Sequence, residues 1–201
     1  MRSNINRREF VGGAIALGGL ALLPGRALAL TEAQSVSLIQ RVTSEVQGII
    51  NSGQSMGPMM VQFEGIFRNY ADVARIAGTC LGAPWRTASN AEKSSYVAAF
   101  QHYISYKYGR QFRSFEGAQI SIVRSRDTGS RGVLVETTIA TRTSAPFIVE
   151  WHVIDTNSGP KFFNLIIEGI SLLASEREEI GAMLAAARGD IGQLNARLLA
   201  T

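Results

Sequence analysis

The stretch RGVLVETTIATRTSAPFIVEWHVIDTNSGPKFFNLIIE, residues 131–168, decides the fold. Three runs within it, residues 131–142, 146–155 and 161–168, alternate apolar with polar side chains. This period of two is typical of strands that bury one face. The apolar side chains that the runs place on one face are Val133, Val135, Ile139, Phe147, Val149, Trp151, Val153, Phe163, Leu165 and Ile167.

Short segments rich in turn-forming residues separate these runs. They are residues 127–129 (DTG), 144–146 (SAP) and 155–160 (DTNSGP). Residues 118–123 form an earlier apolar run that we expect to be a first strand. Because turns this short connect antiparallel neighbours, the sequence predicts a four-stranded antiparallel meander.

Helical spacing of apolar residues flanks the predicted sheet on both sides. Thr31 and Ser89 each begin a capping-box pattern, with Gln34 and Glu92 three residues later. We expect helices over residues 32–50, 58–70, 72–80, 90–112 and 191–198. Another helix is expected to start at Ser171 or Ser175 and to stop at Gly189. Helices followed by consecutive strands indicate the α+β class, with helices packed on one face of the sheet. Helical side chains that can face the sheet are Phe67, Ile76, Phe100, Ile104 and Tyr108.

Residues 1–29 have the three parts of a twin-arginine signal peptide. Arg7 and Arg8 precede Phe10, a short apolar run follows, and ALA at residues 27–29 matches a cleavage site. The apolar run of residues 11–24 is too short, at about 21 Å, for a hydrocarbon core of about 30 Å. We therefore expect an exported single domain over residues 30–201.

Removal of the signal peptide would lower the net charge of the chain from +4 to +1. Four of the 20 basic and one of the 16 acidic residues lie within residues 1–29, which leaves 16 against 15. Nucleic acid binding needs a concentrated basic surface, so we expect no nucleic acid partner.

The candidate chemistry is sparse. Ser55 lies in GQSMG, residues 53–57, which matches the nucleophile elbow of esterases, but that elbow needs a preceding strand and a placed histidine. Here a helix is expected before it, and His102 and His152 have no evident link to it. We expect an interhelical loop and no enzyme.

Metal and cysteine chemistry are equally weakly indicated. Two isolated histidines and Cys80 lack the spacing of metal ligands, so no metal or other cofactor is expected. A buried, inert thiol is the expected role of Cys80. Glu176, Glu178 and Glu179 are expected at a helix start, where acidic residues suit the helix dipole. The predicted apolar sheet face is either an ordinary core or the wall of a pocket, and the pattern alone leaves both open.

Three segments resemble the toluene-tolerance, or MlaC, family of periplasmic phospholipid-binding proteins. The first comprises DVARIA at residues 72–77 with LG at 81–82 and WR at 85–86, the second is FEG at 115–117, and the third is EGISL at 168–172 with Arg177 downstream. The chain departs from the family pattern in three places. Pro160 replaces a tryptophan, Asn164 replaces an aspartate, and Glu176 replaces the aromatic residue before the arginine. The family also commonly uses the general secretory route for export.

The resemblance implies a periplasmic carrier that encloses phospholipid acyl chains between sheet and helices. It implies handover between an outer-membrane lipoprotein–porin complex and an inner-membrane ABC transporter complex with its substrate-binding ring, in maintaining outer-membrane lipid asymmetry. Phospholipid would be cargo, and we expect a monomer. The alternative is an exported, non-catalytic interaction domain with a filled core. The fifteen residues expected to line the lipid cavity are the ten on the sheet face and the five helical ones named above.

Overall fold

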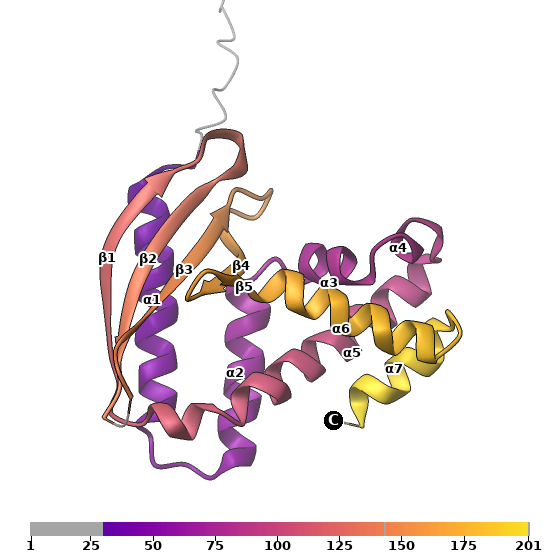
Figure 1. Cartoon of the computed structure of the whole chain (residues 1–201), viewed down its shortest axis with the longest axis horizontal. Helices are drawn as coiled ribbons and strands as arrows, with labels where there is room; N and C mark the ends of the chain where they lie inside the picture. The colour runs from indigo at the N-terminus through magenta and orange to yellow at the C-terminus, as the bar shows by residue number, and fades with distance from the viewer. Residues whose placement is uncertain (1–29, 143, 201) are drawn as a thin grey trace, which may run out of the picture.

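A computed structural model of the chain describes residues 30–142 and 144–200, except for the side chains of residues 112 and 113 (Figure 1). The predicted signal peptide lies outside the described residues. The described helices are α1 (Glu32–Ile50), α2 (Met56–Tyr70), α3 (Val73–Leu81), α4 (Pro84–Thr87), α5 (Asn90–Gly109), α6 (Leu172–Ala186) and α7 (Ile191–Leu199), with short 3₁₀ turns η1 (Phe112–Phe115) and η2 (Gly129–Arg131).

Both predicted capping boxes are confirmed. The Thr31 hydroxyl accepts from the backbone N–H of Gln34, whose side chain accepts from the N–H of Thr31, and α1 begins there. Ser89 and Glu92 make the same reciprocal pair at the start of α5. Each pair satisfies backbone donors that have no partner inside the helix, which fixes where the helix begins.

The strands form one antiparallel sheet in the order in which they follow along the chain. They are β1 (Gln119–Asp127), β2 (Val133–Ala140), β3 (Phe147–Ile154), β4 (Lys161–Ile167) and β5 (Ile170–Ser171). The prediction of four strands is therefore one short. The fifth strand has two residues and follows a tight turn in which Glu168 and Gly169 both have positive φ. The α+β class itself is confirmed.

The helices do not all lie on the sheet. Helix α1 packs against β1 and β2, whereas α3 and α6 pack against β4. Helices α5 and α7 pack mainly on other helices, and Figure 1 shows them in a helical part that extends away from the sheet. An interior therefore lies between the sheet, the helices that pack on it, and the helical part that contains α5 and α7. Within the described residues, no helix combines the length and apolar character that crossing a membrane requires.

Candidate lipid-binding site

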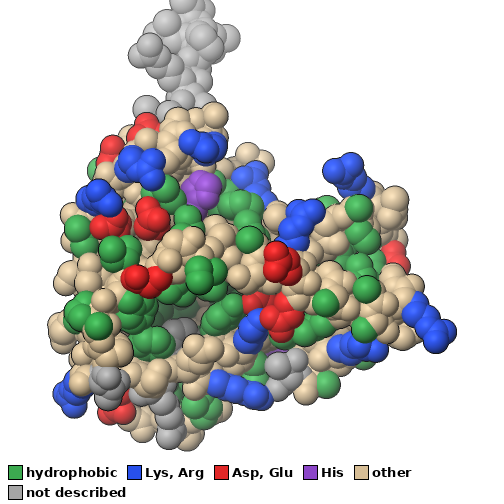
Figure 2. Space-filling view, in the orientation of Figure 1, with side chains coloured by type: hydrophobic (Ala, Val, Ile, Leu, Met, Phe, Trp, Pro, Cys, Tyr) green, Lys and Arg blue, Asp and Glu red, His purple; other side chains and the backbone are tan. Residues whose placement is uncertain are grey.

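A cavity of about 300 Å³ lies between the sheet and the helices. Figure 2 shows the surface hollowed between these two parts, with hydrophobic side chains around the hollow. The lining comes from α1, α2, α3, α5, all four long strands and the first turns of α6. A pocket of this size, walled by apolar and aromatic side chains, is typical of a site for an apolar small molecule.

The structure places twelve of the fifteen predicted residues on the cavity wall. From the helices these are Phe67, Ile76, Phe100, Ile104 and Tyr108, and from the sheet Ile139, Phe147, Val149, Trp151, Phe163, Leu165 and Ile167. Sheet and helices thus both contribute to the cavity wall. The alternation and the helical spacing predicted these apolar faces, but they left a filled core and a pocket equally open.

Three of the predicted residues do not line the cavity. Val133, Val135 and Val153 are completely buried and belong to the continuous hydrophobic core. They lie toward one end of β2 and β3, and α1 packs directly against β2. Side chains from α1 and the sheet fill the interior there, so one alternating face serves both a filled core and an open cavity.

Sequence reasoning missed Phe162 on the cavity wall. Val153 pairs with Phe162 while the neighbouring His152 pairs with Asn164, which leaves Phe163 as an extra residue in β4. Such a bulge breaks strict alternation, so both phenylalanines line the cavity. The Phe162 ring packs edge-on against Trp151, with ring centroids 5.6 Å apart.

Sequence reasoning also missed the contribution of α1 and predicted only Phe67 from α2. Their other lining residues are Val42, Thr43, Val46, Gln47, Ile50, Phe63 and Ile66. The 3.6-residue spacing predicted a buried face for these helices, but spacing does not tell which element that face covers.

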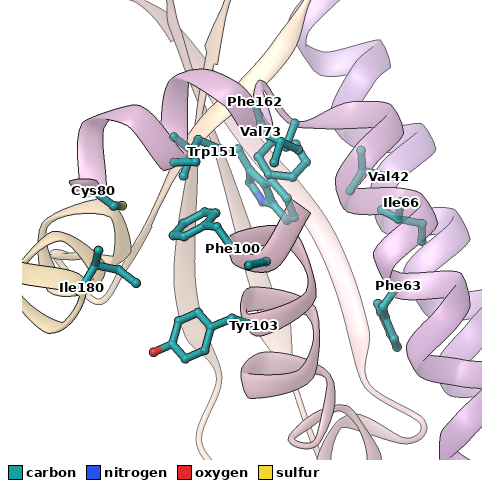
Figure 3. Close-up of a cluster of buried hydrophobic side chains, with 14 of the residues drawn as sticks. Val42, Phe63, Ile66, Val73, Cys80, Phe100, Tyr103, Trp151, Phe162 and Ile180 are labelled. Atoms are coloured by element: carbon teal, nitrogen blue, oxygen red, sulfur yellow. The ribbon is translucent and has the colours of Figure 1, made fainter. Parts of the chain in front are cut away.

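The buried indole of Trp151 has a hydrogen-bond partner, which keeps this wall in place. Its Nε1–H donates to Thr137 Oγ1 over 3.0 Å, and the Thr137 hydroxyl donates to the carbonyl oxygen of Val149, also over 3.0 Å. A buried N–H without a partner would be costly, so this relay makes a tryptophan compatible with the apolar wall. Figure 3 shows side chains from α2, α5 and the sheet converging on this region.

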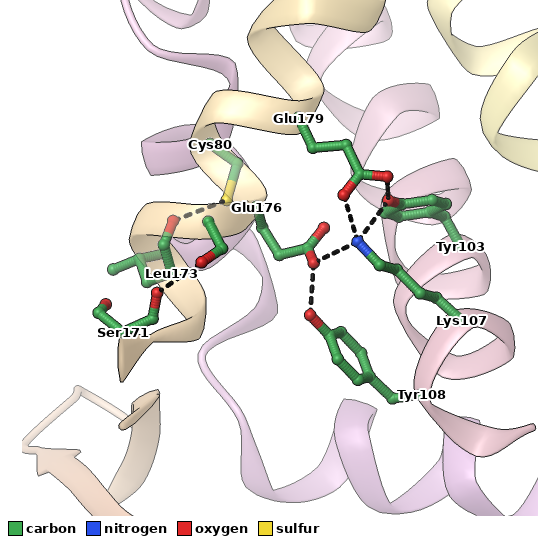
Figure 4. A network of polar contacts seen from close by, with 9 residues as sticks. Cys80, Tyr103, Lys107, Tyr108, Ser171, Leu173, Glu176 and Glu179 are labelled. Carbon is green, nitrogen blue, oxygen red and sulfur yellow. Dashed lines mark hydrogen bonds and ion pairs between the residues drawn. The ribbon is translucent and has the colours of Figure 1, made fainter. Parts of the chain in front are cut away.

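A polar network borders the cavity where α5 and α6 meet (Figure 4). Glu176 Oε1 accepts from Lys107 Nζ at 2.7 Å and from the Tyr108 hydroxyl at 2.5 Å. Lys107 also pairs with Glu179, whose other oxygen accepts from the Tyr103 hydroxyl at 2.8 Å. The network links α5 to α6, and Tyr108 and Glu176 of the network line the cavity.

Burial and these contacts shift the pKa values of the network. Burial, and then the hydrogen bond to Glu176, raises the pKa of Tyr108 above its ordinary value. Burial would lower the pKa of Lys107, but hydrogen bonds to Glu176 and Glu179 outweigh it and raise the pKa. The hydrogen bond from Lys107 holds the pKa of Glu179 below its usual range. The tyrosines stay neutral and Lys107 stays charged around neutral pH.

Comparison with known proteins identifies the fold. Residues 40–200 match the protein family described as MlaC protein. This chain belongs to the MlaC family. The resemblance of the three sequence segments is thereby confirmed. A phospholipid-binding protein from Ralstonia solanacearum, solved in complex with a phospholipid, has a TM-score of 0.69 and 17% identity to this chain, over 84% of this chain and 95% of that protein. That likeness shows a shared fold.

The residues that carried the MlaC resemblance meet at the joint between α3 and α6. Arg177 of α6 donates to the carbonyl oxygen of Thr79 near the end of α3, over 3.3 Å, and lies beside Gly82. The Trp85 ring packs directly over Gly78. These contacts hold α3 and α6 together beside the cavity, whereas Ile76, Phe115 and Leu172 of the same motifs line its wall.

The MlaC-family fold gives Ser55 surroundings unlike those of a nucleophile elbow. Ser55 is exposed at the start of α2, and the segment before it is the loop that leaves helix α1. Nε2 of His152 lies 2.5 Å from the carbonyl oxygen of Arg131, far along the chain on β3. The interhelical loop is as predicted, and the strand that an elbow requires is replaced by a helix.

Neither Cys80 nor a group of metal-binding side chains offers a reactive centre among the described residues. Cys80 is buried, as predicted, and burial raises the pKa of its thiol to about 12. Such a thiol is not a nucleophile near neutral pH. Among the described residues, no group of three histidine, cysteine, aspartate or glutamate side chains has a metal-binding arrangement.

Proposed function

We propose that the mature chain is a carrier that binds phospholipid, with the acyl chains in the cavity between sheet and helices. The single observation that carries this proposal is the composition of the wall: Glu176 is the only acidic or basic residue among the described residues that line it. The MlaC family and the fold shared with a phospholipid-binding protein support the same ligand class.

The physical need for such a cavity is large. Two acyl chains contain on the order of 30 methylenes, and each costs about 0.8 kcal/mol to expose to water. A transfer cost of roughly 24 kcal/mol excludes free diffusion of a lipid between membranes, so the tails must be enclosed. A close-packed interaction domain, the alternative function, has no use for a cavity of this kind.

The family and the predicted signal peptide support the finer parts of the proposal. The carrier is exported to the periplasm, acts as a monomer, and passes phospholipid between an outer-membrane lipoprotein–porin complex and an inner-membrane ABC transporter complex with its substrate-binding ring. It uses no cofactor and catalyses no reaction, since the lipid leaves as it arrived.

The test is mass spectrometry of lipid extracts from purified mature protein, with two matched variants. Val149 and Val135 lie on the same face of neighbouring strands, but only Val149 lines the cavity. Val149→Trp places a ring in space that acyl chain would fill, so bound phospholipid should fall while the delipidated protein keeps near wild-type stability. Val135→Trp overpacks the filled core and should cost about 1–3 kcal/mol.

Two results would contradict the carrier. One is an extract of wild-type protein without phospholipid. The other is equal destabilisation by both tryptophans with no selective loss of lipid from Val149→Trp, which would favour the filled-core interaction domain.

A further inference from the structure

Two polar side chains in the cavity wall have buried oxygens with no partner. Glu176 is 3% exposed, and its Oε2 makes no hydrogen bond in the structure. Ser105, on α5, is 6% exposed, and its Oγ is likewise without a partner. Both residues line the cavity. A buried acceptor left without a donor is costly, so each such atom needs an explanation.

We propose that Glu176 and Ser105 form an acceptor site for an N–H or O–H donor on the polar part of the bound lipid, and that this site selects ammonium headgroups over fully methylated ones. The inference rests on the proposed carrier function and adds a headgroup preference to it.

The other carboxylate oxygen of Glu176, Oε1, already has two donors from the protein. Oε1 accepts from both Lys107 and Tyr108, and these two contacts fix the carboxylate between α5 and α6. Figure 4 shows both dashed contacts ending on the same oxygen. The second oxygen is therefore held in place and faces no protein donor, which leaves the contents of the cavity to supply one.

The charge of the network favours a donor over an anion. Glu176 and Glu179 carry two negative charges against the single positive charge of Lys107. No lysine or arginine lines the cavity among the residues whose side chains the structure describes. A phosphate group would meet repulsion at Glu176, whereas an ammonium group with N–H donors gains a charge-assisted hydrogen bond.

The position of the network suits a headgroup rather than a chain end. The side chain of Glu176 is 4% exposed, that of Lys107 26% and that of Glu179 43%. The network thus runs from the cavity wall to the surface, where the polar end of an enclosed lipid emerges. Acyl chains have no donors, so within the bound lipid only the polar part can donate to Glu176 Oε2.

The experiment uses two lipids that differ only in the methylation of the headgroup nitrogen, which removes all of its N–H donors. Delipidated mature protein is incubated with equal amounts of dioleoyl phosphatidylethanolamine and dioleoyl phosphatidylcholine, and the retained lipids are counted by mass spectrometry. We expect the wild type to retain the ethanolamine lipid in about five- to ten-fold excess, as a hydrogen bond to a charged group allows. Lys107 and Tyr108 both donate to Oε1, so Glu176→Gln places an amide N–H donor at the position of Oε2 and should bring the ratio close to one.

Glu179→Gln is the matched control. It removes a carboxylate from the same network and the same helix, but both oxygens of Glu179 already have protein donors, and Glu179 does not line the cavity. We expect its ratio to stay clearly above one, because it lowers the negative charge of the network but leaves the unpartnered Oε2 of Glu176 in place. Ser105→Ala should lower the ratio at least two-fold, which keeps the test valid if Glu176→Gln does not fold.

The outcomes separate the two proposals. If wild-type protein retains neither lipid, the carrier function fails. If it retains both lipids equally, a water molecule rather than the headgroup occupies the acceptor site, and the headgroup inference alone is overturned. The headgroup inference is also overturned if Glu176→Gln keeps the preference for the ethanolamine lipid. If Glu176→Gln does not fold, an unchanged preference in Ser105→Ala overturns it.

Discussion

Gly78 and Gly181 are both inside helices, but a methyl group would meet different surroundings at each. A Cβ on Gly78 would lie 2.7 Å from the Trp85 ring, whereas a Cβ on Gly181 would meet nothing within 4 Å. Gly78→Ala must displace the ring at the α3–α4 corner and should destabilise by about 1–3 kcal/mol. Gly181→Ala should stabilise by about 0.5–1 kcal/mol, since alanine is the better helix former.

Urea unfolding measures both changes, and Gly181→Ala serves as the control for helix propensity. If Gly78→Ala proved as stable as the wild type, the Trp85 contact would not explain the glycine. The same pair also tests why a Leu-Gly…Trp pattern marks this family, because the structure gives Trp85 a packing role away from the cavity.

Glu176 shows how far single residues could be predicted. The sequence pattern placed it correctly at a helix start among other acidic residues, which is ordinarily a solvated position. Its burial depends on Lys107 and Tyr108, which are 69 and 68 residues away in the chain. No local pattern contains that information. The available signal was its replacement of an aromatic residue in the family pattern, which placed a charge where an apolar side chain was expected.

At the scale of elements, the joint between β4 and α6 sets the position of Glu176. Asn164 of β4 accepts from the backbone N–H of Leu173 at 3.0 Å and donates to the hydroxyl of Ser171 at 2.9 Å. Ser171 in turn accepts from the N–H of Ala174 at 3.2 Å. A strand side chain and the N-cap residue together satisfy the first donors of the helix.

Asn164→Ala removes both contacts and should destabilise the protein by about 1–2 kcal/mol, as the loss of a helix cap does. Asn164→Asp keeps the acceptor for Leu173 and places a negative charge at the helix start, so it should be within about 0.5 kcal/mol of the wild type or more stable. Thermal unfolding measures both, with exposed Asn157→Ala as control. Equal stability of Asn164→Ala and wild type would show that Ser171 alone caps α6.

Elements with a strong period were predictable, whereas their pairing details were not. Alternation over residues 131–168 predicted β2, β3 and β4 and their order. The first strand was expected to end at residue 123 but continues to Asp127, beyond an irregularity between Ile122 and Arg124. The bulge at Phe163 was also missed. Bulges depend on how two strands match along their length, so one strand read alone does not show them.

At the scale of the whole molecule, a single interior has a packed end and an open end. Where α1 lies against β2, Val133, Val135 and Val153 are completely buried in the core. Farther along, the helical part draws away from the sheet, and the same apolar face borders the cavity. The packed end can supply the stability of the fold, so the open end need not be filled by protein. Sequence could predict the apolar face but not this division, which depends on how the helices are placed.

A carrier between two membranes must leave the cytoplasm, which makes export the prediction for the whole chain. We expect cleavage after Ala29, so that periplasmic protein begins at Leu30. The described domain suits this boundary, because Leu30 packs against the hydrophobic core and Thr31 caps α1 immediately afterwards. N-terminal sequencing and intact mass of periplasmic protein measure it.

The export route is tested on the same full-length chain. Replacing Arg7 and Arg8 together by lysine keeps the positive charge but removes the arginine pair, so the precursor should accumulate in the cytoplasm. Arg26→Lys, just before the cleavage site, is the control and should be exported normally. Full-length protein found only in membranes would show that residues 1–29 act as an anchor. Normal export of the double lysine variant would exclude the twin-arginine route while leaving the carrier itself in the periplasm.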